Sequence, residues 1–244
     1  MKIKFIVSPN FTARKRRKIR YVIIHYTGMR TAQAAIKRLK SRRHQVSCHY
    51  LIDNSGEIVQ MVKDQDIAWH AGVSYWDGKR NINNNSIGIE IQNKGHEFGY
   101  ENFRKVQISS LISLIILLKQ KHNISDAFIL GHSDIAPDRK IDPGYLFPWR
   151  QLYKSGIGLM PNIKKLNNKE LSNAEIMKLQ LLLREFGYKL TISEVLDKET
   201  LQVLYAFQSH YCPAELKQFK VKHKLITYLR ALIRAKNRSL TKKN

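Results

Sequence analysis

Apolar and polar residues follow two different patterns along this chain, and the change comes near residue 158. Before it, runs of β-branched and aromatic residues typical of strands are interspersed with segments whose apolar residues recur at helical spacing. Strands are expected at 21–27, 49–53, 57–62, 86–92 and 127–130, and helices at 31–41 and 103–121. Strands and helices in this order predict an α/β fold with a mixed central β-sheet flanked by helices.

Beyond residue 158 the pattern is purely helical after a linker. Residues 159–171 show no periodicity, which predicts the linker. Three helical stretches follow, and Gly187 and Asp197 have the residue types that end one helix and begin the next. We therefore expect a small three-helix domain over 172–236 and a basic tail over 237–244.

Charge is distributed unevenly over these regions. The chain has 244 residues, with 43 Lys and Arg against 19 Asp and Glu, and a formal net charge of +24. Residues 1–20 hold eight cations and no acid, and residues 159–244 hold 17 cations against seven acids. We expect 1–20 to be a basic arm in front of an α/β domain over 21–158. A protein this basic attracts anionic partners such as nucleic acid, acidic lipid or an acidic polymer.

Composition excludes several classes of protein. Hydrophobic residues make up 43% of the chain, too many for a disordered polycation. Two cysteines, Cys48 and Cys212, exclude a disulfide scaffold, and no apolar run reaches the ~18 residues of a membrane span. The apolar stretch 5–7 is too short for a secretory signal, which favours a cytoplasmic protein or a non-classical route of export. The basic cluster within 14–20 is either a solvated arm, a nucleic-acid patch or a nuclear localisation signal.

The candidate chemistry lies where strands of the α/β part end. His25 ends a buried strand, Glu90 is on the more polar side of another, and a loop over 131–144 follows a third. That loop contains His132, Asp134, Asp138, Lys140 and Asp142. Two His and one carboxylate form a ligand set of catalytic zinc, which leaves a fourth position to water. Spacing alone does not choose among the three Asp, and it leaves Glu90 and Lys140 available for proton transfer and oxyanion stabilisation.

Five segments, in order, resemble the zinc-dependent N-acetylmuramoyl-L-alanine amidases of type 2, a family that includes phage-type amidases and peptidoglycan recognition proteins. The segments are IIHYT at 23–27, VSCHYLID at 46–53, WHAG at 69–72, NNNSIGIEI at 83–91 and GHSDIAPDRKIDPG at 131–144. They cover about residues 21–150. The resemblance implies a bacterial protein whose region 21–158 is the catalytic domain and binds one Zn²⁺ per chain.

The resemblance also implies a role for each matching residue. His25, His132 and Asp142 correspond to the zinc ligands, Glu90 to the general acid/base carboxylate, and Lys140 to the lysine that stabilises the tetrahedral oxyanion. The implied reaction is hydrolysis of the amide between the lactyl group of N-acetylmuramic acid and the L-alanine of the stem peptide, by a zinc-activated water.

Substrate contacts are expected in and after the WHAG segment. Trp69 and His70 match the substrate cleft of the family, and shaping the cleft wall is the alternative role of His70. Tyr75, Trp76 and Asn85 supply aromatic and amide groups that suit a sugar–peptide ligand, although ordinary loop composition explains them nearly as well. The expected partner is peptidoglycan or a muropeptide.

The helical region resembles a peptidoglycan-binding module in two segments, LQLLLREFGY at 179–188 and LDKETLQVLYAFQSHY at 196–211. The usual glycine before the second helix is absent from 194–197, so glycan binding and a buttress against the catalytic domain both stay open. Two further functions are alternatives: peptidoglycan recognition without catalysis, and nucleic-acid binding or nuclear targeting through the basic termini, which is compatible with catalysis.

Overall fold

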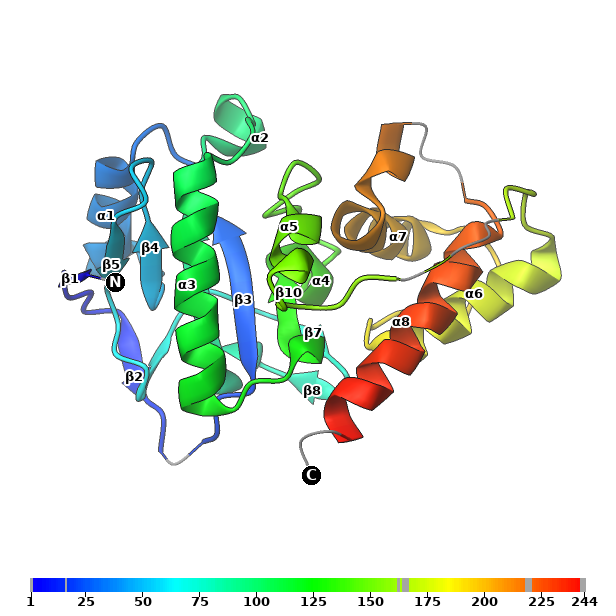
Figure 1. Ribbon diagram of the computed structural model, residues 1–244, viewed down its shortest axis with the longest axis horizontal. Coiled ribbons are helices and arrows are strands. Elements are labelled where there is room, and N and C mark those ends of the chain that lie inside the picture. Colours follow the sequence, from blue (N-terminus) through cyan, green and yellow to red (C-terminus); the bar gives the residue numbers. More distant parts are fainter. Residues whose placement is uncertain (1, 16, 162, 164–166, 218–220, 242–244) are drawn as a thin grey trace.

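A central sheet with helices on both faces forms the α/β part of the molecule, and three helices gather beyond one edge of that sheet (Figure 1). The computed structural model describes residues 2–15, 17–161, 163, 167–217 and 221–241. The expected arm, linker and tail each include residues outside these ranges.

The sheet has six strands and mixed direction. Their order is β1 (Ile3–Phe5), β5 (Ile58–Gln60), β4 (Tyr50–Ile52), β9 (Ser86–Ile91), β3 (Tyr21–Tyr26) and β10 (Ile129–Gly131). Strands β4 and β5, which fall within the expected strands 49–53 and 57–62, pair antiparallel as a hairpin, and every other neighbouring pair is parallel. The mixed sheet predicted from the sequence pattern is therefore confirmed.

Helices cover both faces because successive strand residues point to opposite sides. Leu51 and Val59 pack with α1 (Ala32–Lys40) in one apolar cluster. Their neighbours Ile52 and Ile58 belong to the other cluster, which includes the buried face of α3 (Lys105–His122). These two helices therefore lie on opposite faces of the sheet.

The first twenty residues are part of this fold where the structure describes them. Strand β1 pairs with β5 at one edge of the sheet, and β2 (Phe11–Ala13) pairs antiparallel with β6 (Asp66–Ala68). Arg14, the first cation of the basic cluster, is only 4% exposed. This differs from the expected basic arm, because backbone pairing joins the segment to strands that follow residue 21.

Short elements connect the larger ones. They are η1 (Arg42–His44), β7 (Tyr75–Trp76), β8 (Lys79–Arg80), η2 (Ile82–Asn85), α2 (Gly95–Phe98), η3 (Asp126–Phe128), α4 (His132–Ile135), α5 (Trp149–Lys154) and η4 (Pro213–Lys217). The segment expected to be a loop after β10 thus begins with a short helix, α4. Its N-terminus is capped by Asp134, whose Oδ2 accepts a hydrogen bond from the Gly131 amide at 2.7 Å.

The three predicted helices of the C-terminal region are present as α6 (Asn173–Phe186), α7 (Lys198–Tyr211) and α8 (Lys224–Thr241). Helix α6 ends at Gly187, and the carboxylate of Asp197 accepts a bond from the Thr200 amide at the start of α7. We call the described residues from 171 to 241 the helical module. Its apolar side chains and those of the sheet form one continuous core. In the described part of the chain, no helix has the length and apolar character needed to cross a membrane.

Candidate metal centre

Three parallel strands bring the candidate residues to one edge of the sheet. In the strand register, His25 of β3 lies opposite Glu90 of β9, and Ile24 lies opposite Gly131 of β10. His132 follows Gly131 directly and begins α4. Because parallel strands end at the same edge, where α/β proteins commonly bind ligands, His25, Glu90 and His132 converge there.

Two histidines and one aspartate meet at this edge. The Nδ1 atoms of His25 and His132 lie 3.0 Å apart, and each lies 3.1 Å from Oδ2 of Asp142. All three residues are buried. Zinc bonds to nitrogen and oxygen are about 2.0–2.2 Å long, so ligand atoms in a tetrahedral site are roughly 3.3 Å apart. The triangle observed here is close to that size.

Hydrogen bonds orient both imidazoles toward this triangle. His132 Nε2 lies 3.3 Å from the carbonyl oxygen of Ala71, which can only accept, so Nε2 carries the hydrogen and Nδ1 has a lone pair. His25 Nε2 lies 3.0 Å from His70 Nδ1, and His70 Nε2 lies 3.0 Å from Ser86 Oγ. In the matching tautomers, His25 donates to His70 and His70 donates to Ser86. Both Nδ1 lone pairs then face the carboxylate, which is the arrangement a cation requires.

The charges in the triangle suit a divalent cation. Burial, together with His132, lowers the pKa of His25 to about 4, so this imidazole is neutral at neutral pH. Asp142 supplies a carboxylate oxygen to the same triangle. Two neutral nitrogens and one anionic oxygen, with no hydrogen between them, fit zinc by their chemistry as well as by their spacing.

The other two aspartates of the loop lie elsewhere. The carboxylate of Asp134 is fully buried, and its hydrogen bonds go to Gly131, Tyr188 and His210. Asp138 is exposed. Among the described residues, His25, His132 and Asp142 form the one group of three or more His, Cys, Asp or Glu side chains close enough to share an ion. The geometry therefore favours Asp142 where spacing left the choice open.

Glu90 and Lys140 line the cleft above the triangle, which has a cavity volume of about 610 Å³. One carboxylate oxygen of Glu90, Oε2, is buried and has no hydrogen-bond partner among the described residues. Burial raises the pKa of Glu90 well above its ordinary value, the charge of Asp142 adds to the shift, and the charge of Lys140 opposes it. A buried carboxyl group with a raised pKa and a free oxygen is a candidate for proton transfer.

The expected substrate contacts separate into two groups. Trp69 and His70 line the cleft. Tyr75 lies instead in a crevice between the β7–β8 hairpin and the helical module, and Asn85 donates its side-chain amide to the backbone carbonyl of Lys18. Trp76 is 0% exposed and packs edge-on against rings of the helical module, so it cannot touch a ligand. Its position in the sequence suggested a cleft residue, but the module covers it.

His70 is seated against a glycine of the sheet. A Cβ atom on Gly88 of β9 would lie only 2.3 Å from Cγ of His70, so this strand position must be glycine for the ring to approach. The backbone amides of His70 and Ala71 both donate to Oδ1 of Asn83. Residues 70 and 71 are thus fixed at the points where they contact the two metal-site histidines.

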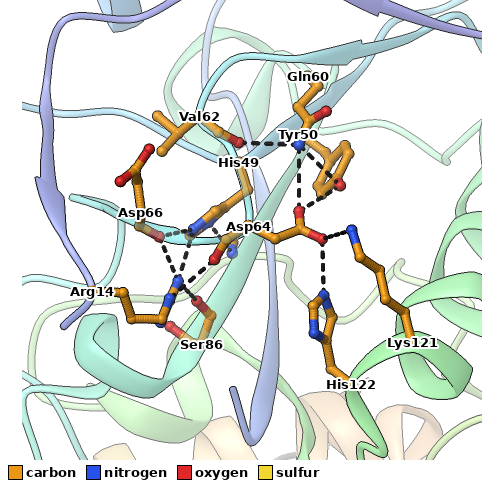
Figure 2. A network of polar contacts seen from close by, with 11 residues as sticks. Arg14, His49, Tyr50, Gln60, Val62, Asp64, Asp66, Ser86, Lys121 and His122 are labelled. Carbon is orange, nitrogen blue, oxygen red and sulfur yellow. Dashed lines mark hydrogen bonds and ion pairs between the residues drawn. The ribbon is translucent and has the colours of Figure 1, made fainter. Parts of the chain in front are cut away.

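Arg14 and Ser86 connect to His70 through hydrogen bonds, and neither was expected from the sequence to have this role. Figure 2 shows the Arg14 guanidinium among backbone carbonyls of Asp64, Asp66 and Ser86, which accept bonds of 3.0, 2.7 and 2.9 Å. A further bond of 2.9 Å goes to the carbonyl of Asn84. In the sequence, Arg14 stands inside a run of cations and has no feature that distinguishes it from its neighbours.

A buried aspartate joins this network to α3. Asp64 accepts bonds from Tyr50 at 2.6 Å and from Lys121 and His122 at 2.8 Å each (Figure 2). Burial alone would raise the pKa of Asp64, but these three bonds outweigh it and lower the pKa below its ordinary value. The segment that contains Asp64 and Asp66, two of the Arg14 acceptors, is therefore attached to α3 on one face of the sheet.

Arg139 is another cleft residue that sequence reasoning missed. Its guanidinium donates to the backbone carbonyls of Ala71 and Val73. Ala71 is the residue whose carbonyl also faces His132. The only sequence signal was the position of Arg139 beside Lys140, in the most specific of the five matching segments.

Comparison with known proteins identifies the relatives of this chain. Residues 15–145 match the family model described as N-acetylmuramoyl-L-alanine amidase. The N-acetylmuramoyl-L-alanine amidase AmiD of Escherichia coli is 34% identical over 213 residues, which are 80% of this chain and 76% of AmiD. The 1,6-anhydro-N-acetylmuramyl-L-alanine amidase AmpD of Haemophilus influenzae is 40% identical over 111 residues, 45% of this chain and 58% of AmpD.

Solved structures agree with this result. AmiD of E. coli, in complex with the substrate anhydro-N-acetylmuramic acid-L-Ala-D-γ-Glu-L-Lys, superposes with a TM-score of 0.79 at 30% identity and covers 93% of this chain and 98% of AmiD. AmpDh3 of Pseudomonas aeruginosa, in complex with anhydromuramic pentapeptide, gives a TM-score of 0.74 at 28% identity and covers 94% and 95%. The likeness therefore extends over both the α/β part and the helical module.

Proposed function

Because this chain belongs to the N-acetylmuramoyl-L-alanine amidase family, we propose that His25, His132 and Asp142 hold one zinc ion at its active site. The protein is a peptidoglycan hydrolase, and it cleaves the amide between N-acetylmuramic acid and the L-alanine of the stem peptide. The named relatives are bacterial, which gives no support to nuclear targeting through residues 14–20.

One observation carries the assignment of the site. The three candidate ligand atoms lie 3.0–3.1 Å from one another, in the same cleft as a buried carboxylate oxygen that has no partner among the described residues. A zinc ion bound there supplies a Lewis acid that lowers the pKa of a water molecule and polarises a carbonyl. A buried carboxylate oxygen without a partner costs free energy, and peptidoglycan recognition without catalysis does not require one.

The side chains of the cleft supply the remaining steps. Glu90 takes a proton from the attacking water as the new C–O bond forms at the lactyl carbonyl. The ammonium group of Lys140 lies in the same cleft and stabilises the negative charge that develops on the carbonyl oxygen. Glu90 then delivers its proton to the alanine nitrogen as the C–N bond breaks. The second proton of the water passes from the new carboxyl group to the amine, so the products are a lactyl carboxylate and an ammonium group.

The relatives indicate which muropeptides the enzyme accepts. AmiD and AmpDh3 were solved with anhydromuropeptides, so we propose that soluble muropeptides with an anhydro sugar are among the substrates of this enzyme. The cleft provides an indole at Trp69 and exposed apolar groups at Phe98 and Ile141 as surfaces for the sugar or the lactyl methyl group. Mass spectrometry of products from anhydro and reducing muropeptides tests this preference.

Substitution of the carboxylate tests the mechanism. Glu90→Gln removes the proton carrier and leaves the three ligands intact, so it should retain stoichiometric zinc and lose about 100- to 10,000-fold in turnover. Glu97→Gln is the matched control, because Glu97 lines the same cleft but is exposed. Turnover is measured as release of stem peptide from a defined muropeptide. Full activity of Glu90→Gln would remove Glu90 from the mechanism.

Removal of a ligand tests the metal site. Asp142→Ala and His25→Ala should each lower zinc content, measured by elemental analysis after dialysis, and a chelator should abolish turnover of the wild type. Asp138→Ala is the control, because this exposed aspartate lies in the same loop. Stoichiometric zinc in Asp142→Ala would show that the ligand set is different.

A further inference from the structure

The helical module contacts the element that carries one of the metal-site histidines. Helix α4 holds His132 at its first position and Asp134 two residues later. The hydroxyl of Tyr188 donates to Oδ1 of Asp134 at 2.6 Å, and Nδ1 of His210 donates to Oδ2 at 2.7 Å. Both donors belong to the helical module, Tyr188 after α6 and His210 on α7.

We propose that the helical module is a positioning element of the active site, which fixes His132 through the hydrogen bonds of Tyr188 and His210 to Asp134. This inference rests on the proposed zinc site. It assigns the module a role in catalysis whether or not its helices also bind glycan.

The burial of Asp134 makes these bonds necessary. Its side chain is 0% exposed, and a buried carboxylate is costly unless hydrogen bonds replace the water it has lost. Two of its three bonds come from the module, and the third comes from the Gly131 amide at the start of α4. Loss of either module donor therefore leaves a poorly solvated anion two residues from His132.

Helix α4 has little stability of its own. It spans four residues, and an isolated helix of this length does not form in water. Its orientation must come from tertiary contacts, and α7 is among the elements it touches. A small rotation of α4 would move His132 Nδ1 away from the other two ligand atoms.

Aromatic packing holds the two donors in place. The ring of His210 is stacked between Trp149 of α5, at a centroid distance of 3.6 Å, and Tyr211, at 3.8 Å. On the other side, Tyr188 packs edge-on against Trp76 at 4.8 Å. The module is thus attached to the α/β part on both sides of Asp134, and the two donors have little freedom to turn away.

Polar contacts beside Trp76 fix the same interface. Lys236 of α8 donates to Asp77 at 2.8 Å and to the carbonyl of Phe186 at 2.9 Å, and the Asp77 amide donates to the carbonyl of Gly187 at 2.9 Å. A Cβ atom on Gly187 would lie 2.7 Å from the Trp76 ring. The connection between α6 and Tyr188 is therefore closely fitted to the α/β part.

Single hydroxyl deletions test this proposal in the full-length chain. Tyr188→Phe removes one bond to Asp134 and keeps the ring. Tyr228→Phe is the matched control, because Tyr228 is a half-buried tyrosine on α8 with no hydrogen bond to α4 among those the structure describes. Four quantities are measured for each variant: the zinc dissociation constant by chelator competition, kcat and KM on a muropeptide, and Tm without zinc.

We expect Tyr188→Phe to raise the zinc dissociation constant about 10-fold and to lower kcat with little change in KM. Loss of a group that bonds a ligand directly costs about 10- to 100-fold in affinity, and Asp134 acts on His132 only through α4, so the low end of that range is expected. Tyr228→Phe should change neither quantity. His210→Phe, which keeps a stacked ring without its donor, should resemble Tyr188→Phe. The visible spectrum of the Co²⁺-substituted enzyme should shift in both Asp134-directed variants, since it reports ligand geometry.

An unchanged zinc dissociation constant and kcat in Tyr188→Phe, with only a lower Tm, would overturn the proposal and leave the module as an attached domain. His132→Ala distinguishes this failure from failure of the zinc site. If His132→Ala binds zinc as tightly as the wild type, the proposed metal site is wrong and the positioning role fails with it. If His132→Ala loses zinc while Tyr188→Phe does not, only the positioning role is overturned.

Discussion

The two ends of this chain are its most basic regions, and β1 and the helical module lie at opposite edges of the central sheet (Figure 1). Hydrogen bonds connect each end to a histidine of the candidate metal site. On the N-terminal side, Arg14 binds the backbone of Ser86, whose hydroxyl faces His70, which in turn faces His25. On the C-terminal side, donors of the helical module bind Asp134, two residues after His132.

The difference between the two ends lies in which groups are buried. At the N-terminal end a cation itself is buried, and its guanidinium joins several loops through their carbonyls. At the C-terminal end the groups that bond to Asp134 are a phenol and an imidazole, while the three arginines of α8 face solvent. Net charge therefore says little about function here, because each region buries a cation that holds the fold together, Arg14 at one end and Lys236 at the other, and exposes most of the rest.

Among the changes that test this comparison, the largest effect is expected where the N-terminal connection meets the candidate metal site. Gly88→Ala would place a Cβ atom 2.3 Å from His70 Cγ, so the ring must move and His25 loses its partner. A displacement of this kind costs roughly 100-fold in turnover. The measurement is kcat on a muropeptide, together with zinc content.

A double variant separates the steric effect from the loss of the histidine. In Gly88→Ala with His70→Ala the clash is absent, so Tm should recover toward the wild type. Zinc affinity should stay weak, because His25 Nε2 still has no partner. Recovery of zinc affinity in the double variant would show that His70 does not orient His25.

A smaller effect is expected at the N-terminal end of the same connection. Arg14→Ala leaves four buried or half-buried carbonyl acceptors without their donor and should lower the free energy of unfolding by about 3 kcal/mol. Burial lowers the pKa of Arg14 to about 10, so the group is still charged at neutral pH, and Arg14→Lys cannot restore a forked set of bonds. Denaturant unfolding measures both variants. Arg17→Ala, an exposed cation of the same run, should change stability by less than about 0.5 kcal/mol.

The sequence predicted the parts of the site that depend on strands and on a specific motif. Apolar runs located β3, β9 and β10, and parallel strands bring His25, Glu90 and His132 to one edge. The choice of Asp142 could be made by resemblance but not by spacing. It depends on the direction of each carboxylate, and Asp134 turns away because its donors lie more than fifty residues later in the chain.

Long-range packing also explains what sequence reasoning misplaced. Trp76 follows the WHAG segment closely and has the residue type of a sugar-binding platform, yet Phe186 and Tyr188 cover it. Arg14 looks like any member of its cluster until β2 pairs with β6 and brings it to the carbonyls of Asp64 and Asp66. In both cases the decisive neighbour lies fifty or more residues away, where local pattern carries no information.

The smallest effect is expected from the exposed cations of the helical module. Arg230, Arg234 and Arg238 recur every four residues on α8, so they lie along one exposed face, whereas Lys236 of the same helix is buried against Asp77. Replacing the three arginines with serine should weaken association with intact peptidoglycan only a few-fold at low salt, and not at high salt, because exposed charges are screened.

The same triple variant tests whether these cations serve an anionic polymer in general. Turnover of a small soluble muropeptide should be unchanged, since the three arginines are not among the residues lining the cleft. Retention of wild-type protein on DNA should fall steeply with salt if the basic end also binds nucleic acid, and it should weaken in the triple variant. A flat salt dependence would contradict nucleic-acid binding. If the triple variant lost muropeptide turnover, the exposed arginines would also support the active site. That result would contradict our assignment of polymer attraction to the arginines and of positioning to the buried groups alone.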